Sequence, residues 1–187
     1  MTTAQTSQSQ LITIVWLDDH LNDYDRDLVE RYLKSFMDLG VVVKEARHVK
    51  EYSDILEKSF SNNELIHGLV LDVMLTSYDR ALMSMEHLGV SSIRDGSLLT
   101  AGWRVLMAHQ MEHLRKPGNR KPYLDRYDDT PKLILTAGND AKDEARRQGV
   151  SVDEKSLKFV WKNSEDYDAD ISKEISSWVK GLRAKAY

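Results

Sequence analysis

Five short apolar runs, each followed by a stretch with helical spacing, constrain the fold more than any other feature of the sequence. The stretches between them place apolar residues three and four positions apart, which is typical of amphipathic helices. The runs themselves are dense in Val, Ile and Leu, as expected for strands buried on both faces. We therefore predict five βα units forming one parallel sheet with helices on both sides. The predicted strands cover residues 11–17, 41–47, 66–75, 132–137 and 157–162, and the predicted helices 23–39, 49–60, 101–115, 140–148 and a last helix around 171–182.

Two stretches interrupt this alternation. Residues 76–100 separate the third strand from its helix by far more than the usual few residues. Their middle part, YDRALMSMEHLG, predicts a short helix whose apolar face (Leu82, Met85 and Leu88) either docks on the domain or binds a partner; we favour docking. Residues 116–131 hold all three prolines and predict a long loop, with the charged run RYDD exposed to solvent. Either stretch is a specialised element or a tolerated insertion.

Composition excludes several classes of protein. The chain has 187 residues and no cysteine, so disulfides and thiolate chemistry are excluded. Its net charge of −4 argues against a nucleic-acid-binding surface. The apolar runs are too short to cross a membrane, and residues 1–10 lack the pattern of a secretory signal. We expect a cytoplasmic protein with a disordered tail (1–10) and one domain (11–187).

Polar residues stand at the carboxyl ends of four predicted strands. Ligand sites of open parallel sheets lie at this edge. Three carboxylates close together repel one another, and a hard divalent cation such as Mg²⁺ relieves the repulsion. A lysine and a hydroxyl beside them suit phosphoryl oxygens, and a central carboxylate can be a nucleophile that forms an aspartyl phosphate. The residues are Asp18, Asp19, Asp72, Thr136 and Lys162.

Each of these signals is weak when taken alone. A lone strand-end aspartate is more often a helix cap, and an acidic pair after an apolar strand also occurs in P-loop proteins. The sequence has no GxxxxGK[ST] motif, which argues against a P-loop nucleotidase. The joint occurrence of these residues, in order along four strands, is much more specific.

Four motifs carry a resemblance to a known family. VWLDDH, LDVML, LILTAG and FVWK resemble the receiver domain of two-component response regulators, from about residue 11 to 184. The resemblance implies a (βα)₅ flavodoxin-like fold with strand order 2-1-3-4-5. It also implies that Asp72 accepts a phosphoryl group from the phosphohistidine of a sensor kinase or a histidine phosphotransfer protein. Such a domain is a signalling phosphoacceptor rather than an enzyme.

The resemblance further assigns the metal ligands. It implies that Asp19 and Asp72 bind Mg²⁺ directly, with Mn²⁺ as a substitute, and that Asp18 acts through a bound water. The main-chain carbonyl of Met74 would complete the ligands from the protein.

It also assigns the groups that respond to phosphorylation. Thr136 and Lys162 would contact the phosphoryl oxygens. Phe159 matches the family's aromatic switch position, and its alternative role is plain strand packing. Because no output domain follows the last helix, we expect output through a downstream protein effector, and the sequence leaves homodimer formation open.

Departures from the family keep other functions open. Thr76 and Asn163 stand where the family usually has proline. A pseudo-receiver, which keeps the fold as a protein-interaction module without phosphorylation, is the main alternative. A haloacid-dehalogenase-type phosphohydrolase also uses a strand-end aspartate, but it needs a second acid where this chain has Met74.

Overall fold

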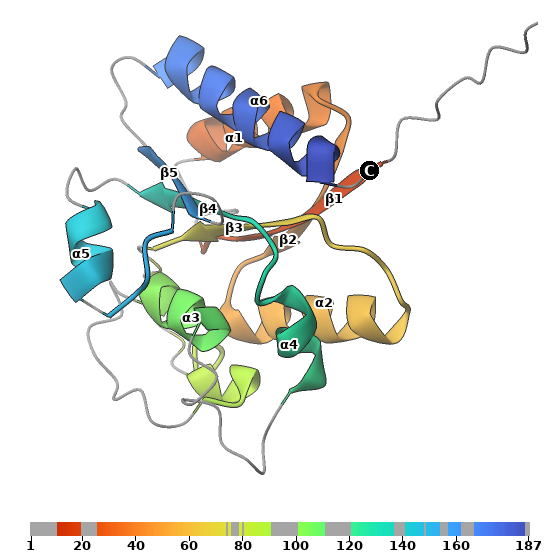
Figure 1. Ribbon diagram of the computed structural model, residues 1–187, viewed down its shortest axis with the longest axis vertical. Helices are drawn as coiled ribbons and strands as arrows, with labels where there is room; N and C mark the ends of the chain where they lie inside the picture. Colours follow the sequence, from red (N-terminus) through yellow and green to blue (C-terminus); the bar gives the residue numbers. More distant parts are fainter. Residues whose placement is uncertain are drawn as a thin grey trace, which may run out of the picture.

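The computed structural model contains a five-stranded, all-parallel sheet in the order β2-β1-β3-β4-β5, which confirms the predicted fold class (Figure 1). It describes residues 11–19, 26–73, 75, 79, 81–90, 101–110, 121–136, 141–147, 149–153, 157–161 and 167–185, with the backbone alone at 26–28, 161 and 167–170. The predicted tail (1–10) lies outside the described residues. The strands are β1 (Ile12–Leu17), β2 (Val41–Ala46), β3 (Gly68–Asp72), β4 (Lys132–Thr136) and β5 (Leu157–Trp161).

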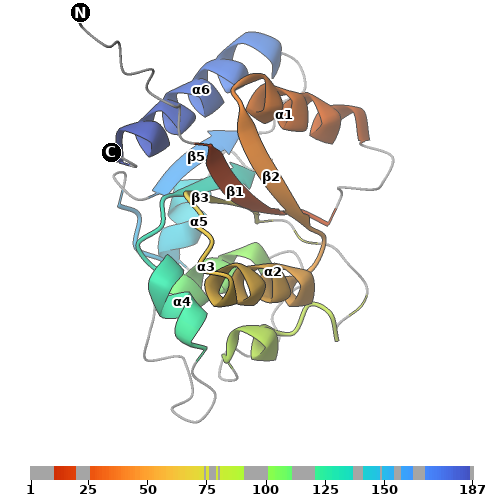
Figure 2. The ribbon, with the colours of Figure 1, turned by 90° about the vertical axis from the view of Figure 1, so that its right-hand side faces the viewer.

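The helices lie on both faces of this sheet (Figure 2). Within the described residues, none of them is both long and apolar enough to cross a lipid bilayer. They are α1 (Arg26–Asp38), α2 (Val49–Ser61), the 3₁₀ helix η1 (Met85–Leu88), α3 (Ala101–Gln110), α4 (Pro122–Tyr127), α5 (Ala141–Arg147) and α6 (Tyr167–Lys185).

Side chains of the central strands alternate between two cores. Along β1, Trp16 belongs to the core under α1 and α6, whereas Val15 and Leu17 belong to the core under α2 and α3. All six residues of β1 are buried, because both faces of the strand are covered. This explains why the central strands β1, β3 and β4 read as continuous apolar runs rather than as alternating patterns.

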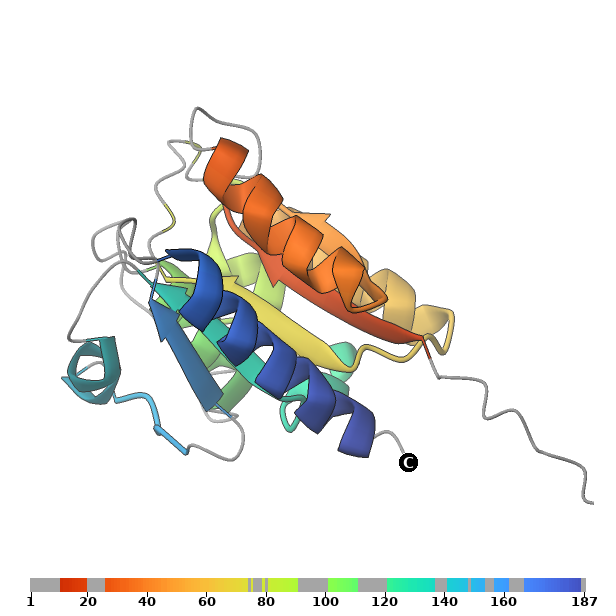
Figure 3. The same ribbon diagram turned by 90° about the horizontal axis from the view of Figure 1, so that it is seen from above.

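One face of the sheet is covered by α1 and α6, which lie side by side across it (Figure 3). Four large rings fill this core, and their contacts are edge-on or steeply inclined, with centroids 5.9–6.3 Å apart. Such geometry adds a modest stabilisation to the burial of the rings. We call this cluster the aromatic layer; its residues are Trp16, Tyr32, Phe36 and Trp178.

The other face carries α2, α3 and α5, and two further segments pack on this side. Helix α4 lies within 116–131, so the prediction of a loop was wrong for residues 122–127. Its apolar residues Tyr123, Leu124 and Tyr127 are buried, and Pro122 occupies the first helical turn, where it is tolerated. The prediction that RYDD is a solvated loop was wrong as well, because Arg126 and Tyr127 belong to this helix and Tyr127 is buried.

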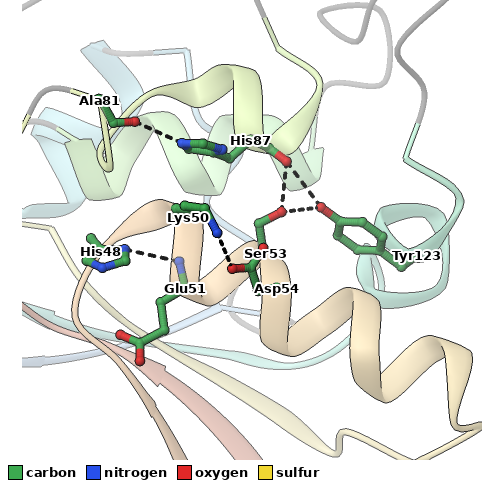
Figure 4. A network of polar contacts seen from close by, with 8 residues as sticks. All are labelled: His48, Lys50, Glu51, Ser53, Asp54, Ala81, His87 and Tyr123. Atoms are coloured by element: carbon green, nitrogen blue, oxygen red, sulfur yellow. Dashed lines mark hydrogen bonds and ion pairs between the residues drawn. The ribbon is translucent and has the colours of Figure 1, made fainter.

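The insertion docks on the domain, as predicted. Met85 and Leu88 of η1 are buried in the core that α2 and α3 share. A hydrogen-bonded group ties η1, α2 and α4 together (Figure 4). The hydroxyl oxygens of Ser53 and Tyr123 are 2.5 Å apart, and they lie 2.8 and 3.2 Å from the carbonyl oxygen of His87. The described segment 81–90 of the insertion is therefore part of the folded domain.

A second buried group joins α2, α3 and the end of α4. The hydroxyl oxygen of Tyr52 lies 2.8 Å from Nε2 of His109, whose Nδ1 lies 3.5 Å from a carboxylate oxygen of Asp128. Tyr52 and His109 are at most 1% exposed, so both side chains belong to the packed interior. We call the two groups together the polar seam: Ser53, the His87 carbonyl, Tyr123, Tyr52, His109 and Asp128.

One strand is shorter than predicted. The third strand was expected over 66–75, but β3 covers only Gly68–Asp72. The third helix was expected over 101–115; the structure describes α3 over Ala101–Gln110, and residues 111–115 lie outside the described residues. Within the described residues α3 begins at Ala101, one residue before the stretch GWRVL (102–106).

Candidate functional site

Three carboxylates meet at the carboxyl edge of the sheet. Asp18 directly follows β1, and Asp72 is the last residue of β3. Because Leu17 and Leu71 are register partners in these neighbouring strands, the two aspartates leave the sheet side by side. One carboxylate oxygen from each of Asp18, Asp19 and Asp72 lies within 4.8 Å of the other two.

Burial raises the electrostatic cost of placing these three carboxylates together. Asp18 is fully buried and Asp72 is 2% exposed, whereas Asp19 is half-buried. Negative charges at this spacing repel one another more strongly away from bulk water. A divalent cation would offset the repulsion, and a donor set made only of oxygens suits Mg²⁺ or Mn²⁺. These residues therefore fit the predicted metal by their chemistry and spacing.

The main chain holds the cluster in place on rigid elements. The Asp18 amide donates a hydrogen bond of 3.0 Å to the carbonyl of Ala46, at the end of β2. Asp72 is paired with Leu135 in the ladder between β3 and β4. Each carboxylate thus projects from a strand end whose position is set by its neighbours, which is what an active or binding site requires.

Thr136 is the last residue of β4 and is 2% exposed. It lies one position beyond Leu135, the partner of Asp72. Its hydroxyl is therefore carried by the strand next to Asp72, one residue nearer the carboxyl edge. This is the place that the sequence predicted for it, and its role in contacting phosphoryl oxygens stays a prediction.

Phe159 packs from β5 onto the face that carries α3 and α5. Its ring centroid lies 6.2 Å from that of Trp103 and 5.9 Å from the ammonium nitrogen of Lys142. The side chain is partly buried against the core. This placement agrees with strand packing, and the switch role of Phe159 stays a prediction.

Two predicted site residues cannot be placed. Lys162 and Met74 lie outside the described residues, as do Thr76 and Asn163, where the family usually has proline. Among the predicted metal and phosphoryl-contacting residues, the structure thus brings together the three aspartates and sets Thr136 on the adjoining strand.

Sequence reasoning missed one contact at this site. A Cβ built on Gly102 would lie 2.1 Å from the carbonyl oxygen of Asp72 and 2.5 Å from Cα of Val73. Only a glycine lets the first turn of α3 approach the end of β3 this closely. The sequence predicted a helix over 101–115, but nothing in it indicated that this helix touches the main chain of Asp72.

Comparisons with known proteins do not identify a family. No protein-family model matches the chain, and no curated protein matches it. One similar solved structure is titled as amino acids 181–211 of the yeast Spc42 trimeric coiled coil fused to another structure. It is 13% identical, has a TM-score of 0.49, and is matched over 95% of this chain and 82% of its own. A similarity this low carries no argument, so any function rests on the residues themselves.

Proposed function

We propose that this protein is a phosphoacceptor receiver of a two-component or phosphorelay system. The observation that carries the proposal is the buried meeting of Asp18, Asp19 and Asp72 at the carboxyl edge of a 2-1-3-4-5 sheet. The burial of Thr136 at the end of the adjoining strand supports it. The resemblance of the strand-end motifs to receiver domains supplies the reaction.

In this reaction a carboxylate oxygen of Asp72 attacks the phosphorus of an N-phosphorylated imidazole. The new O–P bond forms as the P–N bond breaks, and the imidazole leaves with the electron pair and takes up a proton from solvent. When bound, Mg²⁺ would supply positive charge for the three carboxylates and the transferred oxygens. The strand end would hold Asp72 in a fixed orientation for attack.

The product would place about two negative charges on Asp72. The Thr136 hydroxyl is on the adjoining strand and would donate a hydrogen bond to a phosphoryl oxygen. Movement of Thr136 would leave space for Phe159 to change its rotamer, which would shift an existing equilibrium of the surface around β5. The donor would be a phosphohistidine protein, and a downstream protein would read the changed surface.

Intact-protein mass after incubation with acetyl phosphate and Mg²⁺ tests the proposal. We expect one added phosphoryl group on the wild type and none on Asp72→Asn. Asp38→Asn is the matched control, because Asp38 is exposed at the end of α1, and it should be labelled like the wild type. Failure of the wild type to take a phosphoryl group from acetyl phosphate and from a panel of phosphohistidine donors would favour the pseudo-receiver.

A further inference from the structure

The first turn of α3 packs directly against the end of β3, the strand that carries Asp72. The contact is made by Gly102, where any side chain would meet main-chain atoms rather than a flexible neighbour: the Cβ of an alanine would lie 2.1 Å from the Asp72 carbonyl oxygen and 2.9 Å from its carbonyl carbon. Real Cβ atoms do not approach other atoms this closely, so either the helix or the strand would have to move.

The helix is held on its other sides. Next to Gly102, Trp103 is 3% exposed and packs against Phe159. At the far end of α3, His109 is fixed by Tyr52 of α2. Eight of the ten residues of α3 are buried, so a shift of the whole helix would disturb packing along its length.

At this point the end of β3 is held less firmly than α3. Beyond Asp72, the amide of Val73 donates a long hydrogen bond of 3.3 Å to the carbonyl of Leu135. The regular ladder of β3 ends at Asp72. A methyl group on residue 102 would therefore displace the main chain of residues 72 and 73 more easily than it would displace α3.

We infer that Gly102 is a positioning residue for the Asp72 carboxylate. Its missing side chain lets α3 support the end of β3, which keeps Asp72 close to Asp18 and Asp19. The inference deepens the proposed function, because the supported group is the proposed phosphoacceptor. It concerns the geometry of the three carboxylates, however, and it is testable without metal or phosphoryl donor.

The chain offers two glycines as controls. Gly181 in α6 has nothing within 4 Å of a built Cβ, so Gly181→Ala should leave every property of the site unchanged. Gly68 begins β3, and its Cβ would lie 2.5 Å from the Trp178 ring. Gly68→Ala therefore disturbs packing on the opposite face and at the opposite end of the same strand.

A double-mutant cycle in EDTA is the decisive experiment. Asp72→Asn should raise the urea midpoint of otherwise wild-type protein, because it removes one of three crowded negative charges. In the Gly102→Ala background we expect at most half of that rise, since the carboxylate has already moved away. In the Gly68→Ala background we expect the full rise, although that variant is itself less stable. If Gly102→Ala does not fold in buffer, all backgrounds are compared in sucrose, which favours the folded state.

A rise that is equal in the wild-type and Gly102→Ala backgrounds, or absent from both, would overturn the inference. A second readout is the affinity for Mn²⁺ alone, which should fall at least tenfold in Gly102→Ala and stay unchanged in Gly181→Ala. If the wild type binds no Mn²⁺ and accepts no phosphoryl group while the coupling to Asp72 persists, the proposed function fails and the positioning role of Gly102 stands.

Discussion

The two faces of the sheet are stabilised by different means. On one face the aromatic layer packs with aliphatic side chains in a core beneath two helices. On the other face the polar seam lies between α2, α3, α4 and η1, because η1 and α4 cover surfaces of α2 that would otherwise meet water. A buried polar group destabilises a fold unless it is paired. The comparison teaches that η1 and α4 are integral to the fold, and that hydrogen bonding makes the burial of the polar seam tolerable.

The largest expected loss lies in the aromatic layer. Phe36 is fully buried and its ring meets those of Trp16 and Trp178. Phe36→Ala should lower the free energy of unfolding by about 3–5 kcal/mol, because it leaves a cavity in a packed core. Urea unfolding measures the change. The neighbouring Met37 is 67% exposed, and Met37→Ala should cost less than about 0.5 kcal/mol. If both variants lose the same free energy of unfolding, the aromatic layer does not stabilise the fold as described.

A smaller loss is expected beside the polar seam, at Lys132. This lysine is 3% exposed, and its ammonium donates hydrogen bonds of 2.6 and 2.8 Å to the carbonyls of Asp128 and Thr130. Lys132→Met keeps the apolar stem but leaves these carbonyls without their donor, which should cost about 1–3 kcal/mol. Lys158→Met is the matched control on the next strand, since that lysine pairs with Glu174 at the surface. If both variants unfold at the same urea concentration, the buried lysine is not a stabilising contact.

Alkaline pH should weaken the α2–α4 side selectively. Burial raises the pKa of Tyr123 to about 12, although its hydrogen bond with Ser53 opposes the shift. Between pH 10 and 12 the unfolded chain therefore loses a phenolic proton that the folded protein keeps, so stability is full below about 10 and falls as the pH rises. In Tyr123→Phe the slope of stability against pH should be smaller by up to about 1.4 kcal/mol per unit. Identical slopes in urea titrations would contradict this.

Burial also raises the pKa of Tyr52, well above its ordinary value, and Tyr123 and Asp128 add to the shift. Tyr52 should therefore contribute to the same alkaline loss. Both tyrosines belong to the polar seam, so the pH series tests that group.

The smallest effect is expected at Ser53, which links α2 to η1 and α4. Ser53→Ala removes one neutral hydroxyl and should cost about 1 kcal/mol. Its diagnostic effect is local: the amides of 85–88 should exchange hydrogen faster, while those of α1 and α6 keep their wild-type rates. Uniform acceleration over both faces would mean that the seam does not hold the insertion.

Much of the architecture was predictable because it follows from local patterns in the sequence. Continuous apolar runs follow from burial on both faces, and the resemblance to receivers supplied the strand order. The meeting of Asp18, Asp19 and Asp72 followed from parallel strands, since their carboxyl ends share one edge. The roles of these residues, and of Thr136 and Phe159, stay predictions.

Other features had no local signal. Helix α4 was missed because its three apolar residues stand among prolines and charges, and their burial depends on α2. The contact between Tyr52 and His109 joins residues 57 positions apart, and nothing in either neighbourhood indicates the partner. The same holds for Gly102, whose requirement is space beside Asp72 rather than a turn of its own.

The most direct test of the central claim is to locate the phosphoryl group. Borohydride reduces an acyl phosphate and leaves free carboxylates and phosphoesters unchanged, so peptide mass spectrometry of reduced, phosphorylated protein marks the acceptor. The account predicts homoserine at position 72 alone, and none in protein that was not phosphorylated. Reduction at another aspartate, or an added phosphoryl group that resists borohydride, would contradict Asp72 as the acceptor.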